Sequence, residues 1–133
     1  MTDPQLLELA AALIEVFETC KLMSYRDSGG VWTIGIGHTK GVTAGMTCTR
    51  AQALQWFSED QAPLLAIVAG KNPLAGAAYV SFGFNCGSGA LKALLSGQIK
   101  FQDRIRDAKG TVQPGLVARR RLEEALVNYG KAA

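Results

Sequence analysis

The chain has 133 residues, a length typical of one domain that buries a sizeable core. Its apolar fraction of 48% and charged fraction of 19% fit a globular protein and exclude a disordered one. No apolar run approaches the roughly 18 residues that a membrane span needs, since Glu8 and Glu15 interrupt the apolar residues 6–17. Without a basic segment before that stretch, the sequence predicts neither a signal peptide nor an anchor, and so predicts cytoplasmic synthesis.

Positive charge is concentrated toward the end of the chain. The net charge is +3, and residues 98–133 contain eight Lys/Arg against four Asp/Glu, whereas residues 1–97 contain six against seven. A basic C-terminal third can attract a polyanion such as nucleic acid, a lipid surface or an anionic cell-wall polymer. It can equally consist of solvated helix faces, and charge alone does not decide between these interpretations.

The three cysteines, Cys20, Cys48 and Cys86, are odd in number and far apart. This spacing fits neither a disulfide framework nor a zinc site. We therefore expect buried, reduced thiols that pack as small apolar side chains.

The first predicted helix begins at Asp3-Pro4, with Asp3 as the N-cap and Pro4 in the first helical position. Apolar residues then recur at helical spacing and define one face: Leu6, Leu9, Ala10, Leu13, Ile14 and Phe17. The pattern ends near Glu18, which falls at the edge of that face. A carboxyl at an apolar boundary is partly desolvated, so its pKa rises and it can act as a general acid.

A turn and a strand follow. Asp27-Ser28-Gly29-Gly30 is typical of a hairpin turn, and residues 31–38 alternate with period two, which predicts a strand. Gly35 and Gly37 share a face with Thr33 and leave it bare, as happens where a ligand or another backbone approaches closely. Further turns in residues 41–45 favour a small sheet of two or three short strands.

The remainder is predicted to be helical. Thr49 to Gln52 fits a capping box that starts a helix ending near Asp60, and Asn72-Pro73 starts another that runs to Gly87. The latter is apolar nearly all round, which indicates a central buried helix. Shorter helices are expected over residues 63–68, 90–95, 98–109 and 114–129. The predicted architecture is a helix, a small sheet and then a helical bundle.

Glu18 and Asp27 lie on different elements that meet at a corner. Two carboxylates beside a cleft suit hydrolysis of a glycosidic bond, because one protonates the leaving oxygen while the other activates water. On spacing alone, a helix-end acid and a turn-forming aspartate explain them equally well. Thr33 is in isolation more simply structural, and so is His38, because no thiols or other histidines are arranged to complete a metal shell with it.

The series Glu18-x8-Asp27-x5-Thr33, followed by residues 35–39 (G-I-G-H-T), resembles the phage-type (T4-type) lysozyme family of endolysins. Three later blocks resemble that family in the same order: residues 41–60, 80–87 (V-S-F-G-F-N-C-G) and 114–120 (P-G-L-V-A-R-R). The resemblance implies an α+β, lysozyme-like fold, with a small β-hairpin lobe joined to a larger all-helical lobe and a cleft between them. It implies one domain over residues 1–133, with the first helix and β lobe in about 1–60 and the helical lobe in about 61–133.

Carried over by position, the resemblance makes Glu18 the general acid, Asp27 the base that holds the attacking water, and Thr33 a residue that helps to place that water. It implies an inverting muramidase that cleaves the β-1,4 bond between N-acetylmuramic acid and N-acetylglucosamine. Substrate contacts are implied for Asn85, Tyr25, Phe84 and Gly37. Structural roles near the site are implied for His38, paired with Asp60, and for Arg119 and Arg120.

The expected partner is bacterial peptidoglycan, with no metal, no organic cofactor, no nucleic acid and no membrane anchor, and the expected state is a monomer. The family implies accumulation in the host cytoplasm and passage to the wall when a holin opens the membrane. Two other classes remain open. A non-catalytic peptidoglycan-binding module would keep the cleft and lose turnover, and a basic helical nucleic-acid-binding protein would use the run Arg119 to Arg121.

Overall fold

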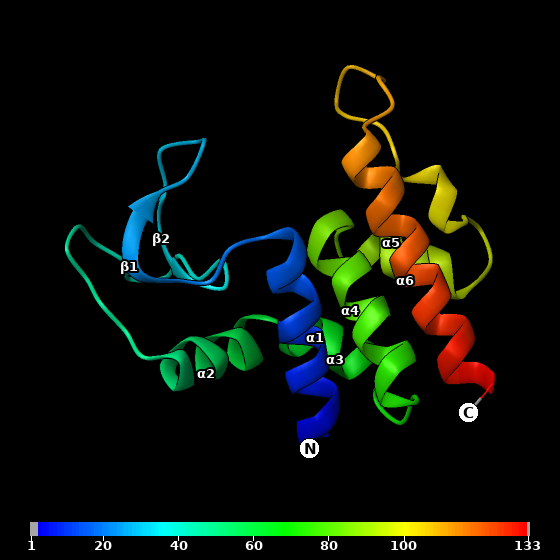
Figure 1. The fold of residues 1–133 in the computed structure, drawn as a ribbon, viewed down its shortest axis with the longest axis horizontal. Coiled ribbons are helices and arrows are strands. Elements are labelled where there is room, and N and C mark those ends of the chain that lie inside the picture. The colour runs from blue at the N-terminus through cyan, green and yellow to red at the C-terminus, as the bar shows by residue number, and fades with distance from the viewer. Residues whose placement is uncertain (1–2, 133) are drawn as a thin grey trace. The chain divides into compact units, whose positions relative to one another are not determined.

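The computed structural model describes residues 3–132 as helices joined to a small sheet (Figure 1). The elements, in chain order, are α1 (Pro4–Phe17), β1 (Lys21–Arg26), β2 (Trp32–Gly35), α2 (Arg50–Asp60), α3 (Ala62–Ile67), α4 (Pro73–Cys86), α5 (Ser88–Leu95), the 3₁₀ turn η1 (Phe101–Asp103) and α6 (Pro114–Ala132). The fold class is the predicted one, α+β. Among these helices, none is both long and apolar enough to cross a membrane.

The chain forms two compact units. The hairpin unit is Ala11–Ala62, and the helical unit comprises the residues up to Ala10 together with those from Pro63 onward. The expected division assigned the whole first helix to the β lobe, whereas the first turns of α1 group with the helical unit.

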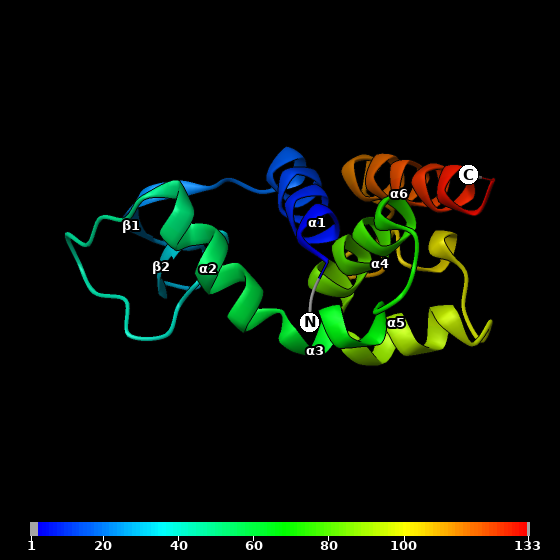
Figure 2. The same cartoon turned by 90° about the horizontal axis from the view of Figure 1, so that it is seen from below.

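In the hairpin unit, β1 and β2 pair antiparallel, with Tyr25 opposite Thr33 and Arg26 opposite Trp32. Helix α2 packs against β2 (Figures 1 and 2). Gly35 makes this packing possible, because a Cβ at that position would lie 3.0 Å from the Cβ of Ala53. The sequence left open whether a ligand or another part of the backbone approaches Gly35 closely. The structure supports the second explanation, because α2 is the element that approaches it.

The predicted strand over residues 31–38 is wrong in extent. It ends at Gly35, and a turn at Ile36-Gly37 brings His38 back to pair with Ile34. Gly37 supplies the positive φ of +69° that this reversal needs. The first strand, β1, precedes the predicted hairpin turn, but the sequence analysis assigned no residues to it, because its sequence KLMSYR is mostly exposed and has no clear apolar alternation.

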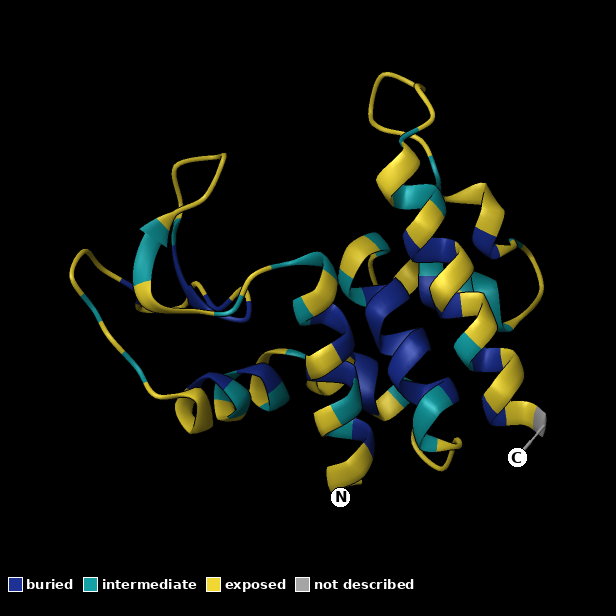
Figure 3. Ribbon diagram, viewed as in Figure 1, coloured by how far each residue is buried: buried dark blue, intermediate teal, exposed yellow. Residues whose placement is uncertain are grey.

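In the helical unit, α4 is the central buried helix that the sequence predicts. Asn72 caps its N-terminus by accepting from the amide of Leu74 at 2.9 Å. Every residue from Ala75 to Gly83 is buried, as the dark ribbon of Figure 3 shows. Helix α6 packs along α4 in both views (Figures 1 and 2).

The helix predicted over residues 98–109 is wrong. Only η1 forms, and the chain then opens into a loop in which Arg106 bridges Val112. The carboxylate of Asp107 accepts from the amides of Lys109 at 2.9 Å and Thr111 at 3.0 Å. Such side-chain bonds give the backbone an alternative to a helix. Helix α6, by contrast, continues through Gly130 to Ala132, beyond its expected end.

Candidate active site

Glu18 directly follows the last residue of α1. Its amide continues the helical pattern by donating to the carbonyl of Ile14 at 2.8 Å. The residue is partly buried, as its place at the edge of the apolar face predicted. Its carboxyl is thus attached to the rigid end of a helix and lies at the boundary between core and solvent.

Asp27 is the first residue of the turn between the two strands. Its Oδ1 accepts from the amides of Gly29 at 2.9 Å and Val31 at 2.8 Å. The turn is closed by the amide of Gly30, which donates to the carbonyl of Asp27 at 2.9 Å. The backbone of its own turn therefore fixes the orientation of this exposed carboxylate.

Thr33 lies on β2 and is buried, with 4% of its surface exposed. Its hydroxyl donates to the carbonyl of Val31 at 2.9 Å. Val31 thus contacts two candidate site residues, because its amide donates to Asp27 and its carbonyl accepts from Thr33. The turn that orients the carboxylate also orients the hydroxyl.

Two of the candidate substrate contacts also belong to the hairpin unit. Tyr25 pairs with Thr33 across the sheet and is partly buried. The ammonium of Lys21 lies 4.4 Å from the centre of its ring, within the range of a cation–π contact. Gly37 lies in the turn after β2.

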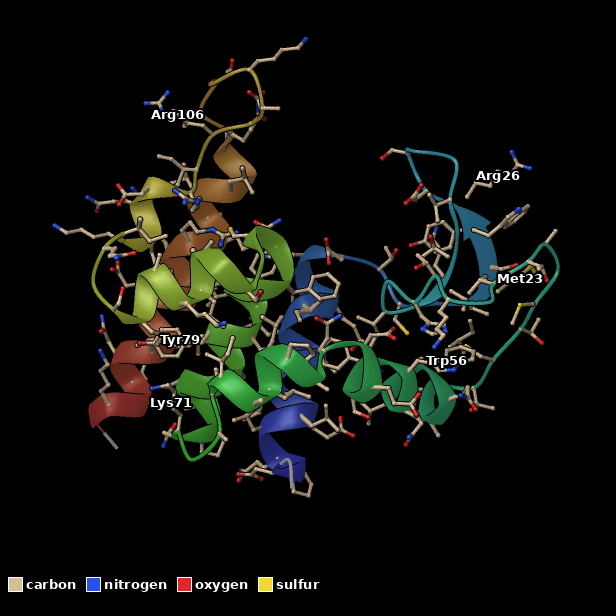
Figure 4. The ribbon with its side chains drawn as sticks, turned by 180° about the vertical axis from the view of Figure 1, so that it is seen from behind. Met23, Arg26, Trp56, Lys71, Tyr79 and Arg106 are labelled. Carbon is tan, nitrogen blue, oxygen red and sulfur yellow. The ribbon has the colours of Figure 1, made fainter. Side chains whose placement is uncertain are left out.

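His38 and Asp60 form the contact that the resemblance implies. Nδ1 of His38 lies 2.7 Å from Oδ2 of Asp60, and the imidazole stacks on the indole of Trp56 with ring centres 4.4 Å apart and 4° between planes. Trp56 projects from α2 toward the hairpin in Figure 4. His38 is buried, with 7% of its surface exposed. Because it contacts Asp60 and Trp56, both on α2, it connects this helix to the turn after β2.

The remaining candidates belong to the helical unit, on α4 and α6. Phe84 is partly buried and Asn85 is exposed near the end of α4. Arg119 and Arg120 are buried, with 4% and 2% of their surfaces exposed. Nη2 of Arg120 donates to Oδ1 of Asn85.

Both arginines pair with a buried acid, Glu123, that the sequence analysis missed. Nε of Arg119 lies 3.3 Å from its Oε2, and Nη1 of Arg120 lies 3.0 Å from its Oε1. The hydroxyl of Ser81 donates to Oε2 at 2.6 Å. Burial raises the pKa of the Glu123 carboxyl, and the hydrogen bond from Ser81 and the charges of both arginines oppose that rise.

A sequence signal for this cluster existed. An acid three and four residues after two adjacent arginines places all three side chains on one face of a helix. The spacing alone also describes a solvated surface triad. Burial distinguishes the two, and burial depends on how α6 packs against α4.

The burial of Arg119 and Arg120 bears on the nucleic-acid alternative. That interpretation needed the run Arg119 to Arg121 as an exposed cationic surface. Only Arg121 of the three is exposed, and the other two guanidinium groups are occupied by Glu123 and its neighbours. The run is therefore a structural feature of the helical unit.

The cysteines differ from expectation in one respect. All three thiols are free, as predicted, but each is partly exposed and not buried. Partial burial is still enough to raise the pKa of the Cys86 thiol. Among residues 3–132, no group of three or more His, Cys, Asp or Glu side chains is placed to hold a metal ion.

A model of the phage lysozyme family matches residues 15–123 of the chain. The endolysin of Acyrthosiphon pisum secondary endosymbiont phage 1 is 33% identical over 138 aligned positions, which cover 90% of this chain and 94% of that protein. The endolysin of Lactococcus phage c2 is 38% identical over 132 positions, which cover 87% of this chain but only 57% of that longer protein.

Solved structures agree. The active form of the P1 phage endolysin Lyz superposes with a TM-score of 0.74 at 25% identity, covering 98% of this chain and 86% of that one. The endolysin of Escherichia coli O157:H7 phage FAHEc1 gives a TM-score of 0.73 at 28% identity and covers 96% of each chain. The chain therefore belongs to the phage lysozyme family and is a lysozyme-type glycosidase that hydrolyses peptidoglycan.

Proposed function

We propose that the chain cleaves the β-1,4 bond from N-acetylmuramic acid to N-acetylglucosamine with inversion at the anomeric carbon. Glu18 protonates the leaving oxygen as general acid. Asp27 acts as general base on a water molecule at the opposite face of the sugar, and Thr33 helps to place that water. This division of roles between two carboxyl groups is the one that inverting glycosidases use.

The observation that carries the proposal is the shared attachment of Asp27 and Thr33 to Val31. Because Oδ1 of Asp27 already accepts two backbone amides, Oδ2 is the oxygen that takes a proton from water. The Thr33 hydroxyl donates its hydrogen to Val31, so its oxygen acts as an acceptor toward the same water. A water that donates to two acceptors points its lone pair away from both, toward a sugar carbon.

The position of Glu18 supports its role as the acid. A general acid has to be protonated when the substrate binds, and partial burial favours the neutral carboxyl. Glu18 is partly buried at a helix end, whereas Asp27 is exposed. The two acids thus have different surroundings, as separate acid and base roles require.

The test combines variants with product analysis. Wild type, Glu18→Gln, Asp27→Asn and Thr33→Ala are compared for clearing of a purified peptidoglycan suspension. We expect losses of at least about 100-fold for the two carboxyl variants, in line with the usual contribution of general acid–base groups, and a smaller loss for Thr33→Ala. Glu59→Gln, which alters an exposed carboxyl on α2 of the same unit, is the matched control and is expected to clear like wild type.

Two product measurements test the finer claims. NMR of the products before mutarotation is expected to show the α-anomer, and an initial β-anomer would contradict inversion. Borohydride reduction is expected to label N-acetylmuramic acid at the new reducing ends, and a labelled N-acetylglucosamine would contradict the assigned bond. Full activity of Glu18→Gln would contradict the role of Glu18.

We also propose that the protein acts as a monomer that reaches the wall after a holin permeabilises the inner membrane. In bacteria that express the chain, lysis is expected to follow permeabilisation by a co-expressed holin. Equally rapid lysis without the holin would contradict this route. The expected monomer is checked by light scattering.

A further inference from the structure

The helical unit contains a buried series of side-chain contacts that ends at an exposed amide. The series runs from Glu123 through Arg120 to Asn85. Glu123 has no exposed surface and Arg120 has 2%, and their contact is 3.0 Å long. Asn85, at the other end, is exposed.

Buried contacts between charged side chains contribute little net free energy to the stability of a fold. Desolvating a carboxylate and a guanidinium costs free energy that their attraction offsets only partly. Nε of Arg120 is buried and finds no acceptor within residues 3–132, which adds a further cost. Stability alone therefore does not explain why Arg120 is buried at this place.

The geometry of Arg120 defines its orientation. Its guanidinium lies 4.9 Å from the centre of the Phe82 ring. Nη1 forms an ion pair with Oε1 of Glu123 at 3.0 Å and donates to Sγ of Cys86 at 3.3 Å. Nη2 donates to Oδ1 of Asn85. With one face on an aromatic ring and two nitrogens bound, the guanidinium plane has little freedom to rotate.

This arrangement decides which way the Asn85 amide faces. A guanidinium group only donates hydrogen bonds, so the amide atom that meets it has to be the oxygen. The thiol of Cys86 reinforces this choice, because its Sγ lies 3.7 Å from the same oxygen and burial raises its pKa, which keeps it a protonated donor. The NH₂ group of Asn85 consequently points away from Arg120.

We propose that Arg120, held by Glu123, is a positioning residue that fixes the Asn85 amide with its NH₂ group presented to substrate. Asn85 then acts as a hydrogen-bond donor and selects an acceptor on the glycan, namely the carbonyl oxygen of an acetamido group. This inference rests on the proposed function together with the substrate contact that the family resemblance implies for Asn85. It adds the direction of the hydrogen bond and the residues that set it.

Asn85→Asp tests the direction without removing the partner of Arg120. The new carboxylate keeps an oxygen toward the guanidinium and gains an ion pair there, so the melting temperature is expected to stay equal or rise. On the side that faces away from Arg120, the NH₂ group, a hydrogen-bond donor, is replaced by a carboxylate oxygen, which only accepts. We expect the apparent KM for peptidoglycan to rise about tenfold or more, as for an unsatisfied polar contact, with a smaller change in kcat.

The matched control is Asn128→Asp, which adds the same charge at an exposed asparagine of α6 and is expected to leave KM unchanged. A second probe is peptidoglycan whose amino sugars have been chemically N-deacetylated. On that material the difference between wild type and Asn85→Asp is expected to vanish or reverse, because the acetamido acceptor has become an ammonium donor.

A double-mutant cycle tests the positioning role of Glu123. Glu123→Gln removes the charge that holds Arg120 and is expected to raise KM several-fold; in an Asn85→Ala background it is expected to raise KM no further. A purely structural role would produce the same loss in both backgrounds.

Failure of this inference differs from failure of the proposed function. If wild type does not clear peptidoglycan, the proposed function is wrong. If wild type clears it and Asn85→Asp has the KM of wild type, the proposed function stands and the positioning role is overturned. An equal KM increase for Asn128→Asp would also overturn it.

Discussion

At the scale of single residues, the imidazole of His38 is held on two sides within the hairpin unit. Trp56 covers one face of the imidazole ring, and the carboxylate of Asp60 accepts a hydrogen bond from Nδ1. An ionised carboxylate only accepts hydrogen bonds, so Nδ1 is the nitrogen that has the proton. His38 is therefore the residue through which the turn after β2 is fixed to α2.

Asp60→Ala is expected to lower the free energy of unfolding by about 1–3 kcal/mol, because it leaves the buried imidazole N–H without its acceptor. The neighbouring Glu59→Ala removes an exposed carboxylate from the same turn of α2 and is expected to change stability by less than about 0.5 kcal/mol. Urea unfolding of both variants measures the difference. Equal effects would show that the Asp60 contact is not structural.

Asp107 shows how one side chain changes a local prediction. Its carboxylate accepts from two backbone amides and, at 2.7 Å, from the side-chain amide of Gln113. Hydrogen bonding, first of all from the Thr111 amide, lowers the pKa of Asp107. The residues around it have acceptable helical propensity, so the sequence predicted a helix. Whether an aspartate bonds to its own loop depends on the turn geometry, which periodicity does not encode.

The lowered pKa of Asp107 predicts a pH dependence. A carboxyl with a lower pKa when folded contributes stability that is complete above its unfolded value, about 3.9, and that is lost as pH falls through the folded value. The melting temperature of wild type is therefore expected to exceed that of Asp107→Ala by a constant amount from pH 5 to 7. The gap is expected to shrink below about pH 4. A gap that persists unchanged to the lowest pH at which the fold survives would contradict this.

At the scale of elements, explicit start signals gave the best predictions. Asp3-Pro4, Thr49 and Asn72-Pro73 each predicted a helix, and each caps one through the side-chain oxygen of Asp3, Thr49 or Asn72. These signals are local, so tertiary packing does not alter them. The strand β1 lacked any such signal, because it is held by pairing with β2 and by an isolated bridge from Met23 to Thr47.

Helix α6 contains two glycines in contrasting surroundings. A Cβ at Gly130 would lie 2.8 Å from the amide nitrogen of Ala75 and 2.8 Å from Oδ1 of Asn72, whereas a Cβ at Gly115 would meet nothing within 4 Å. Gly130 therefore lets the end of α6 approach the start of α4. This explains why a residue expected to terminate the helix lies inside it.

Gly130→Ala is expected to destabilise the protein by about 1–3 kcal/mol, because backbone atoms of α4 cannot move aside as a flexible side chain would. Gly115→Ala is expected to be neutral or to stabilise by up to about 1 kcal/mol, because alanine favours the helix more than glycine does. Thermal or chemical unfolding of the two variants provides the comparison. A stabilising Gly130→Ala would contradict the close approach.

At the scale of the whole molecule, the sequence predicted the fold class and the family because several blocks match in order along the chain. The candidate catalytic residues were assigned through the resemblance of one short stretch to the family, because spacing alone left their roles open. The buried cluster around Glu123 was not found, because its members come from α4 and α6, far apart in sequence. Its polar side chains also look like surface residues until the packing of the two helices is known.

Burial also determines which charges of the basic C-terminal third, residues 98–133, are exposed to solvent. With Arg119 and Arg120 buried on Glu123, the exposed cations of this third are Lys100, Arg104, Arg106, Lys109, Arg121 and Lys131. They exceed the exposed acids of the same segment, which are Asp103, Asp107 and Glu124. An excess of exposed positive charge favours association with an anionic wall, and salt screens that attraction.

Clearing of an anionic peptidoglycan suspension is therefore expected to slow several-fold as sodium chloride rises from about 10 mM to about 200 mM, over which the Debye length falls from about 30 Å to below 10 Å. Lys100→Glu/Lys109→Glu is expected to clear more slowly at low salt and to respond less to salt. Lys40→Glu/Lys92→Glu makes the same charge change at exposed lysines outside this third and is expected to have the smaller effect. Equal effects of the two pairs would show that net charge alone, and not its placement in the C-terminal third, governs association with the wall.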